Sequence, residues 1–270
     1  MTDPSKDPAP SADKPAEGVA APAYGEDAEM RAYGDDADMR AYGDDADALA
    51  YGDLPPEKAV LLLASIAVVA LCGIVYELLI GTVSSYLLGA SVHQFSLTIG
   101  FFMFAMGVGS YVSRYVSSNL IEVFVRVEMV LALLGGLCSI TLFLLFPYAP
   151  WIYKAAMFGF ILSIGALVGL EIPLLTRVLA ARKGTRRSIA AVMTLDYFGA
   201  LVGSVAFPLL LLPSLGLVSA SFAIGLVNGL VALLNVIWLR DHLRNPRLHL
   251  QLALGTLGLL VLLTAMAGRI

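Results

Sequence analysis

The sequence predicts an all-α protein: a polytopic transmembrane helical bundle of about seven spans that follows a disordered acidic N-terminal tail. Of the 270 residues, 59% are hydrophobic and 14% are charged, a balance typical of membrane proteins and not of water-soluble domains. The charges are unevenly distributed, because 15 of the 21 acidic residues lie within the first 58 residues. A single anchor carrying a globular domain is excluded, since no long polar stretch follows Lys58.

Residues 1–58 are expected to form the disordered tail, because they combine high negative charge with little apolar periodicity. Their first 22 residues lack the basic-then-apolar order of a signal peptide, so we expect no cleavage there. A nonapeptide recurs between residues 23 and 53, as AYGEDAEMR, AYGDDADMR and AYGDDADAL. It has too little glycine for the nine-residue calcium-binding repeats. The repeat is either a solvated, self-repelling segment or a docking strip for a basic partner protein.

Residues 59–270 are predicted to form one transmembrane domain with short connections. An apolar run of about 18–25 residues crosses a bilayer as a helix, because a helix bonds its own backbone polar groups internally. Seven runs qualify, the last of them weaker than the others: 59–80, 95–115, 123–146, 151–174, 189–212, 218–239 and 250–267.

Lysine and arginine predict the orientation, because they collect in alternate connections. The connections that follow the second, fourth and sixth runs are basic, whereas residues 91–94, 147–150 and 213–216 contain neither Lys nor Arg. The positive-inside bias therefore places the basic connections and the N-terminus in the cytoplasm, with the lipid bilayer around the spans. Seven spans would leave the C-terminal end outside.

Paired glycines predict how the helices meet. Three GxxxG motifs fall in the fourth, fifth and sixth runs, at Gly165 and Gly169, Gly199 and Gly203, and Gly225 and Gly229. In lipid, small residues allow two helix backbones to approach closely and gain van der Waals contact. We therefore expect each motif to lie at a helix–helix interface.

Ionisable residues inside the apolar runs are the candidate functional groups, because a charge at bilayer depth is costly and needs a partner or a purpose. One interpretation is a structural ion-pair network that joins the second to fifth helices. The other is a cation-binding or proton-relay cavity built on Asp196, Glu171 and Glu128. The candidate polar network consists of Asp196, Glu171, Glu128, Arg126, Glu122 and Glu77.

Other kinds of site have little support in the sequence. The three histidines do not share metal-ligand spacing on one helix, so we expect no metal site. Cys72 and Cys138 lie in apolar runs and are expected to act as small hydrophobes. Phosphate-binding loops and glycine-rich strand–helix turns are missing, so we expect no cofactor, no nucleic acid and no catalytic residue in this chain.

Long strings of the sequence resemble one enzyme family. The stretch CGIVYELLIGTVSSYLLGASVHQFSLTIGFFMFAMGVGSYVSRYV, at residues 72–116, is similar to the membrane half of bacterial membrane-bound polyamine aminopropyltransferases, the spermidine-synthase-like proteins. The resemblance continues in GLEIPLLTR at 169–177 and LDYFGALVGSVAFPLLLLPSLGL at 195–217. It covers residues 59–239, the N-terminal transmembrane domain of that family.

The resemblance implies a role in polyamine biosynthesis. In that family a Rossmann-like domain follows the bundle and transfers an aminopropyl group from decarboxylated S-adenosylmethionine to putrescine. None of its catalytic motif is found in this chain, so a separate catalytic domain or partner is expected to supply the transferase activity. Two alternatives stay open: a small permease or exporter of cationic metabolites, and a membrane scaffold subunit whose tail recruits a basic protein.

Overall fold

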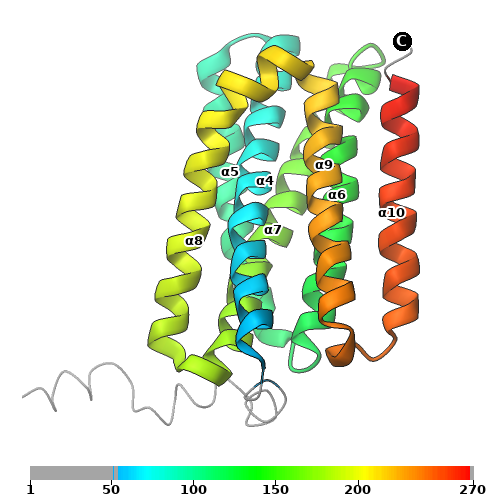
Figure 1. The fold of residues 1–270 in the computed structure, drawn as a ribbon. Coiled ribbons are helices and arrows are strands. Elements are labelled where there is room, and N and C mark those ends of the chain that lie inside the picture. The colour runs from blue at the N-terminus through cyan, green and yellow to red at the C-terminus, as the bar shows by residue number, and fades with distance from the viewer. Residues whose placement is uncertain (1–50, 52–53, 268–270) are drawn as a thin grey trace, which may run out of the picture. The chain divides into compact units, whose positions relative to one another are not determined.

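A computed structural model describes Tyr51 and residues 54–267, apart from the side chains of Arg182, Lys183 and Ala267. The nonapeptide repeat and nearly all of the predicted tail lie outside the described residues. The described part of the chain consists of helices and short connections, without strands (Figure 1). The predicted all-α fold class is confirmed.

The described residues form seven long α-helices, which follow one another in sequence. Three short helical segments adjoin them: the 3₁₀ turns η1 (Ser113–Tyr115) and η3 (Arg240–His242) and the π-helix η2 (Phe207–Leu211). The long helices are α4 (Pro56–Leu88), α5 (Ser91–Val112), α6 (Leu120–Leu145), α7 (Pro150–Lys183), α8 (Thr185–Ala206), α9 (Leu212–Trp238) and α10 (Pro246–Ala267).

Six uninterrupted helical segments within the described residues are long and apolar enough to cross a membrane. The sequence predicts about seven, one for each apolar run, and the counts differ because the fifth and sixth runs fall within a single 54-residue helical stretch, Thr185–Trp238. That stretch reverses direction at Gly216, whose backbone has φ 72° and ψ 178°, a conformation that residues with a side chain rarely adopt. Its two halves, α8 and α9, run in opposite directions along the bundle (Figure 1).

Proline and glycine set several helix ends. α4, α7 and α10 each begin at a proline, at Pro56, Pro150 and Pro246, where the missing N–H would have no intrahelical partner anyway. α7 ends before Gly184, which has φ 79°. Pro208 lies inside the π-helical turn between α8 and α9, consistent with the loss of one backbone hydrogen-bond donor there.

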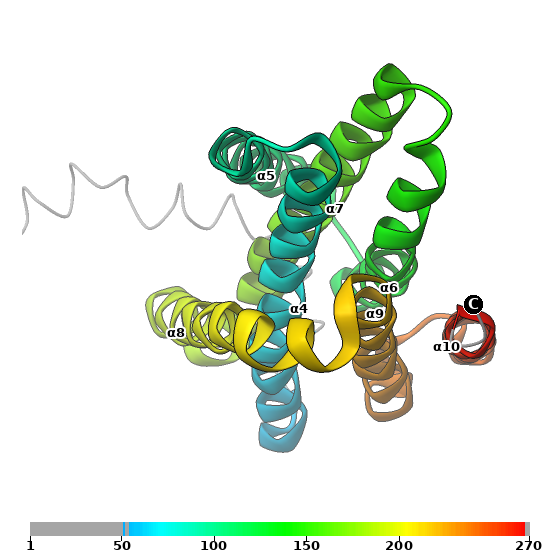
Figure 2. The ribbon, with the colours of Figure 1, turned by 90° about the horizontal axis from the view of Figure 1, so that it is seen from above.

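Helix α4 lies at the centre of the bundle and contacts α5, α6, α7, α8 and α9 (Figure 2). α10 lies at one edge, against α9 and α6. The central helix buries apolar side chains along much of its length, among them Leu62, Val75 and Leu79. A helix that is apolar on several faces is suited to this position, because neighbours cover it on most sides.

All three GxxxG motifs lie at helix–helix interfaces, as predicted. A Cβ added at Gly169 of α7 would come within 2.0 Å of the Met106 carbonyl oxygen on α5. At Gly199 of α8 it would come within 2.0 Å of the Ala67 oxygen on α4. Gly225 of α9 similarly lies against α6, whose Gly136 is also a small residue. Each pair of backbones is thus close enough that a methyl group would not fit.

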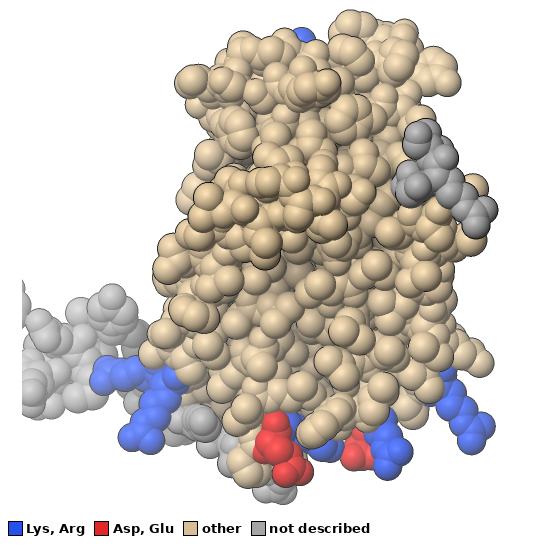
Figure 3. Space-filling view, turned by 45° about the horizontal axis from the view of Figure 1, so that its top comes forward, with Lys and Arg blue, Asp and Glu red and all other residues tan. Residues whose placement is uncertain are grey.

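The two ends of the bundle differ in charge. Lys and Arg gather with Asp and Glu at the end where α4 starts, and most of the remaining visible surface carries neither (Figure 3). The basic residues at the ends of α5, α7 and α9 and at the start of α8 all belong to that end, because successive helices alternate in direction. Lys154, one turn into α7, belongs to the opposite end.

Candidate functional site

Three of the ionisable side chains meet at the charged end of the bundle. Arg126 forms an ion pair with Glu122, one turn earlier on α6. The Arg126 Nε–H also donates to Nε2 of His249 on α10, at 3.2 Å, and that nitrogen lies 3.7 Å from Oε1 of Glu122. The cluster of Glu122, Arg126 and His249 therefore joins α6 to α10.

His249 is held in this cluster from both ring nitrogens. Its Nδ1 lies 3.0 Å from the carbonyl oxygen of Asn245, which can accept a hydrogen bond from an Nδ1–H. The other nitrogen is then free to accept the hydrogen bond from Arg126. The last predicted apolar run starts at residue 250, whereas α10 already begins at Pro246 and buries the His249 ring, which is only 1% exposed.

Glu128, Glu171 and Asp196 form a second group deeper in the bundle. They lie on α6, α7 and α8, and Glu171 interacts electrostatically with both of the others. Glu128 is fully buried, and neither of its carboxylate oxygens has a hydrogen-bond partner. Oε1 of Glu171 is likewise buried and unpartnered. The ion pairs of Lys58, Arg126, Arg240 and His249 go to Glu122 and Asp241 and not to this acidic group.

A small cavity lies between two of these acids. Glu171 and Asp196 line it together with apolar residues of α4 and α7, and its volume is about 10 Å³. A space of that size is close to the minimum that one water molecule needs. Asp196 is partly exposed, so this end of the acidic group is less enclosed than Glu128.

Neutral polar side chains, which the sequence patterns did not indicate, connect α9 to the central helix α4 and to α6. The Asn235 amide donates to the Ser65 hydroxyl of α4 at 3.0 Å, and both residues are buried. Asn228, two turns earlier on the same face of α9, donates to the backbone carbonyl oxygen of Glu128 at 3.1 Å. Its own Oδ1 has no partner. The seven-residue spacing of two Asn residues in an apolar run is the signal that could have indicated them.

Glu77 stands apart from both groups. It lies toward the far end of α4, is 8% exposed, and has no ion pair or hydrogen bond among the interactions of the described residues. Farther along α4, the Ser84 hydroxyl accepts a hydrogen bond from the Tyr153 hydroxyl of α7, at 2.9 Å. At the end of the bundle that contains Lys154, a neutral hydrogen bond thus joins α4 to α7.

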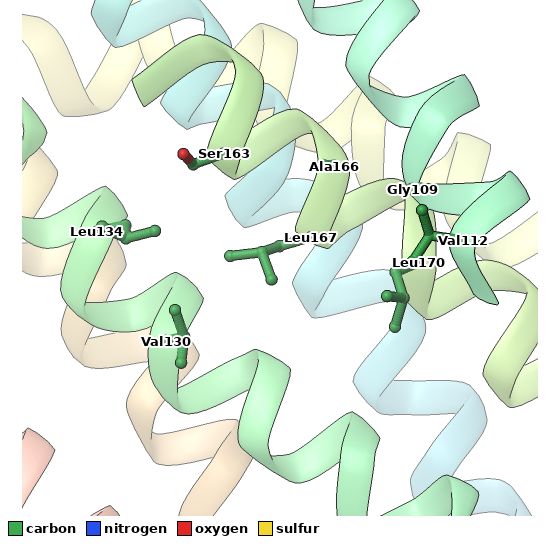
Figure 4. Close-up of a pocket in the computed structure, with 8 residues that line it drawn as sticks. All are labelled: Gly109, Val112, Val130, Leu134, Ser163, Ala166, Leu167 and Leu170. Atoms are coloured by element: carbon green, nitrogen blue, oxygen red, sulfur yellow. The ribbon is translucent and has the colours of Figure 1, made fainter. Parts of the chain in front are cut away.

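A second, apolar cavity lies elsewhere in the bundle. Its volume is about 340 Å³, and it lies between α5, α6 and α7. Leu134 and Leu167 project into the open space, and Ser163 is the lone hydroxyl among the labelled residues (Figure 4). A cavity without charged or convergent polar groups has no means of orienting a polar substrate.

The two cysteines also lie in the interior. Both are free thiols and fully buried, and the Cys72 sulfur lies 3.9 Å from the Ile224 carbonyl oxygen. Cys138 packs within the apolar core of the same half of the bundle. Buried thiols in such surroundings behave as small hydrophobes, in agreement with the expectation for both residues.

An ion pair joins α4 to η3 outside the predicted spans. Lys58 Nζ lies 3.0 Å from Oδ2 of Asp241, and this hydrogen bond, with the charge of Lys58, lowers the pKa of the exposed Asp241 carboxyl. The adjacent His242 ring stacks on Tyr51, with 6.3 Å between the ring centroids. Its partial burial, reinforced by Lys58, lowers the pKa of His242.

Comparison with known proteins identifies several polyamine aminopropyltransferases as relatives. A polyamine aminopropyltransferase of Leptospira interrogans is 44% identical over 169 residues, which are 63% of this chain and 34% of that protein. Polyamine aminopropyltransferase 2 of Ralstonia nicotianae is 44% identical over 186 residues, 68% of this chain and 36% of the relative. The polyamine aminopropyltransferase of Oceanobacillus iheyensis is 39% identical over 201 residues, 73% and 39% of the two chains.

The chain thus spans little more than a third of the length of these relatives. Because the matches are far longer than the 58-residue tail, most of each match falls on the helical bundle. No family model matches the chain. No solved structure matches it either. Over about two thirds of its length, this chain is therefore homologous to proteins named polyamine aminopropyltransferase.

Proposed function

We propose that this chain is the integral-membrane part of a polyamine aminopropyltransferase system, in which it holds a separate catalytic domain at the cytoplasmic face of the inner membrane. The observation that carries the proposal is the 39–44% identity to polyamine aminopropyltransferases, most of which falls on the helical bundle. An apolar bundle of this kind suits anchoring, because its exposed residues include many large hydrophobic side chains.

The charge distribution supports the proposed orientation. The basic residues gather at the end of the bundle where α4 begins (Figure 3), and cytoplasmic connections of membrane proteins are enriched in Lys and Arg. The N-terminal tail then lies in the cytoplasm. Its acidic repeat would be available there to a basic partner protein, if it is a docking strip and not only a solvated segment.

Aminopropyl transfer is assigned to a domain other than the bundle. In this proposal the purified chain, incubated with decarboxylated S-adenosylmethionine and putrescine, forms no spermidine. A hybrid in which residues 59–239 replace the matching part of the Ralstonia relative is expected to form spermidine and to stay in the membrane fraction after an alkaline wash. The same relative without the matching part serves as the control and is expected to leave that fraction.

Two results would overturn the proposal. Spermidine formation by the purified chain alone would contradict the division between anchor and catalyst. Release of the hybrid from membranes by the alkaline wash would contradict the anchoring role.

Transport of polyamines is supported less well by this geometry. The acidic residues suit a cationic substrate, but the cavity that Glu171 and Asp196 line is about 10 Å³. That is room for one water molecule and not for a diamine chain. The larger cavity of about 340 Å³ has no acidic residue in its lining.

A further inference from the structure

The acidic group of Glu128, Glu171 and Asp196 has an excess of hydrogen-bond acceptors. Both carboxylate oxygens of Glu128, one of Glu171 and the Oδ1 atom of Asn228 are buried without a hydrogen-bond partner. Asn228 is fully buried: its amide donates to the backbone oxygen of Glu128 at 3.1 Å and lies close enough to the Glu128 carboxyl group to interact with it as well. Four unpartnered acceptor atoms in one region are costly, because a buried polar atom without a hydrogen bond keeps its full desolvation penalty.

The titratable groups that face these acids do not supply a compensating positive charge. Tyr76 and Cys72 of α4 interact electrostatically with Glu128 and Glu171, and Cys138 of α6 lies near Tyr76. The Tyr76 hydroxyl is itself buried and unpartnered. The groups facing the acids in the described part of the chain are thus acidic or neutral.

The nearest arginines along the same helices are engaged elsewhere. Arg126 lies two residues before Glu128, a spacing that turns the two side chains to different faces of α6. Its guanidinium contacts Glu122 and His249. Arg177, on α7, donates from Nη1 to the backbone oxygen of Val116 at 2.5 Å.

The size of the site restricts what can neutralise it. A carboxylate buried without a counter-ion is normally neutralised, and the smallest species able to do so is a proton. A proton adds no volume, and it converts a carboxyl oxygen from an acceptor into a donor that a neighbouring acceptor can use. The described residues contain no group of His, Cys, Asp and Glu side chains arranged to hold a metal ion. The cavity beside Glu171 has room for one water molecule.

We propose that Glu128, Glu171 and Asp196 form a proton-binding site inside the bundle, with the water-sized cavity between Glu171 and Asp196 as its outer part. Glu128 is the innermost member, at 0% exposure, and Asp196 the most accessible. Intramembrane acids of this kind are characteristic of proton relays. The site is separate from aminopropyl transfer and does not depend on the proposed anchoring role.

Infrared difference spectroscopy of the full chain in lipid nanodiscs tests the proposal. At neutral pH the wild type should show the carbonyl stretch of a protonated carboxyl group, shielded from rapid hydrogen exchange. Glu128→Gln and Glu171→Gln should each lose part of that band and keep the wild-type melting temperature, because the amide resembles the protonated acid in shape. Glu122→Gln is the matched control: it removes an ion-paired acid and should leave the band unchanged.

Other outcomes overturn the proposal. A wild-type spectrum without the protonated band would mean that all three acids are ionised. Calorimetric binding of sodium or putrescine that both Glu→Gln variants abolish would identify a different cation as the ligand. A band that survives in Glu128→Gln and Glu171→Gln but disappears in Glu77→Gln would assign the proton to Glu77 instead.

Discussion

Gly199 of α8 lies directly against the backbone carbonyl of Ala67 on α4, so that a Cβ at position 199 would approach the carbonyl oxygen to 2.0 Å. A backbone atom cannot move aside as a flexible side chain can. The contact therefore fixes how closely the two helices approach, and similar contacts at Gly169 and Gly225 fix two other helix pairs.

Replacing Gly199 should accordingly separate α4 from α8. We expect Gly199→Ala to lower the free energy of unfolding by about 1–3 kcal/mol, the usual cost of overpacking, despite the better helix propensity of alanine. Thermal unfolding in detergent measures the effect. Gly159→Ala is the matched control, because a Cβ there meets nothing within 4 Å. Equal melting temperatures for the two variants would contradict the close contact.

Arg126→Gln should weaken the attachment of α10 to α6. The change leaves the buried Glu122 carboxylate without its ion-pair partner and removes the hydrogen bond to His249. We expect a loss of about 1–3 kcal/mol, the range for hydrogen bonds to charged groups. Arg240→Gln is the control, since its 3.6 Å ion pair with Asp241 is exposed and such pairs contribute little. If both variants melt alike, the cluster does not stabilise the bundle.

The pH dependence of unfolding should contain a contribution from His242. Its pKa in the folded protein lies below the ordinary value of 6.5, so below that pH the unfolded chain binds more protons than the folded one. Stability is thus lost as the pH falls from 6.5 through the folded pKa. His242→Phe keeps a ring to stack on Tyr51 and should make the melting temperature less dependent on pH across this window. A slope as steep as that of the wild type would exclude His242 as its source.

Asp241 should also make unfolding depend on pH, with stability again lost as the pH falls but in a lower pH window. Its pKa is held below the ordinary 3.8 mainly by the hydrogen bond from Lys58. The ion pair is therefore intact above 3.8 and is lost as the pH falls through the folded pKa. Lys58→Met should remove this acid-dependent part, as followed by melting temperature. The same loss in wild type and variant would show that the pair makes no difference.

Cysteine labelling in spheroplasts tests the proposed orientation. The native thiols Cys72 and Cys138 are buried, so they give little background. A cysteine at Val92, which is 80% exposed at the start of α5, should react with an impermeant maleimide from outside. A cysteine at the exposed Arg186 should react only after the membrane is opened. The reverse pattern would place the charged end outside.

The helices and their glycine contacts could be predicted from the sequence because both depend on local patterns. An apolar run long enough to cross lipid must be helical, and paired glycines four residues apart mark where a second backbone can approach. The span count is less certain from sequence, since only the positive φ of Gly216 shows how the fifth and sixth runs are joined within one helical stretch.

The partners of the charged residues could not be predicted, because they come from helices distant in sequence. The spacing of Glu122 and Arg126 predicts their i, i+4 pair, but nothing in the sequence brings His249 to them across 123 residues. The packing of α7 against α8 likewise brings Asp196 close to Glu171.

The buried hydrogen bond between Ser65 and Asn235 links residues 170 positions apart, and this separation has a consequence for biosynthesis. At typical bacterial and eukaryotic rates, a ribosome needs about 10–30 s to synthesise that length of chain. Helix α4 therefore meets α8, which contacts it through Gly199, and α9, which bonds its Ser65, only well after its own synthesis. During that interval the insertion machinery or lipid must cover its Ser65 hydroxyl and the backbone that Gly199 will later contact. The centre of the finished bundle is thus the first helix of the bundle to be made and among the last to acquire all its neighbours.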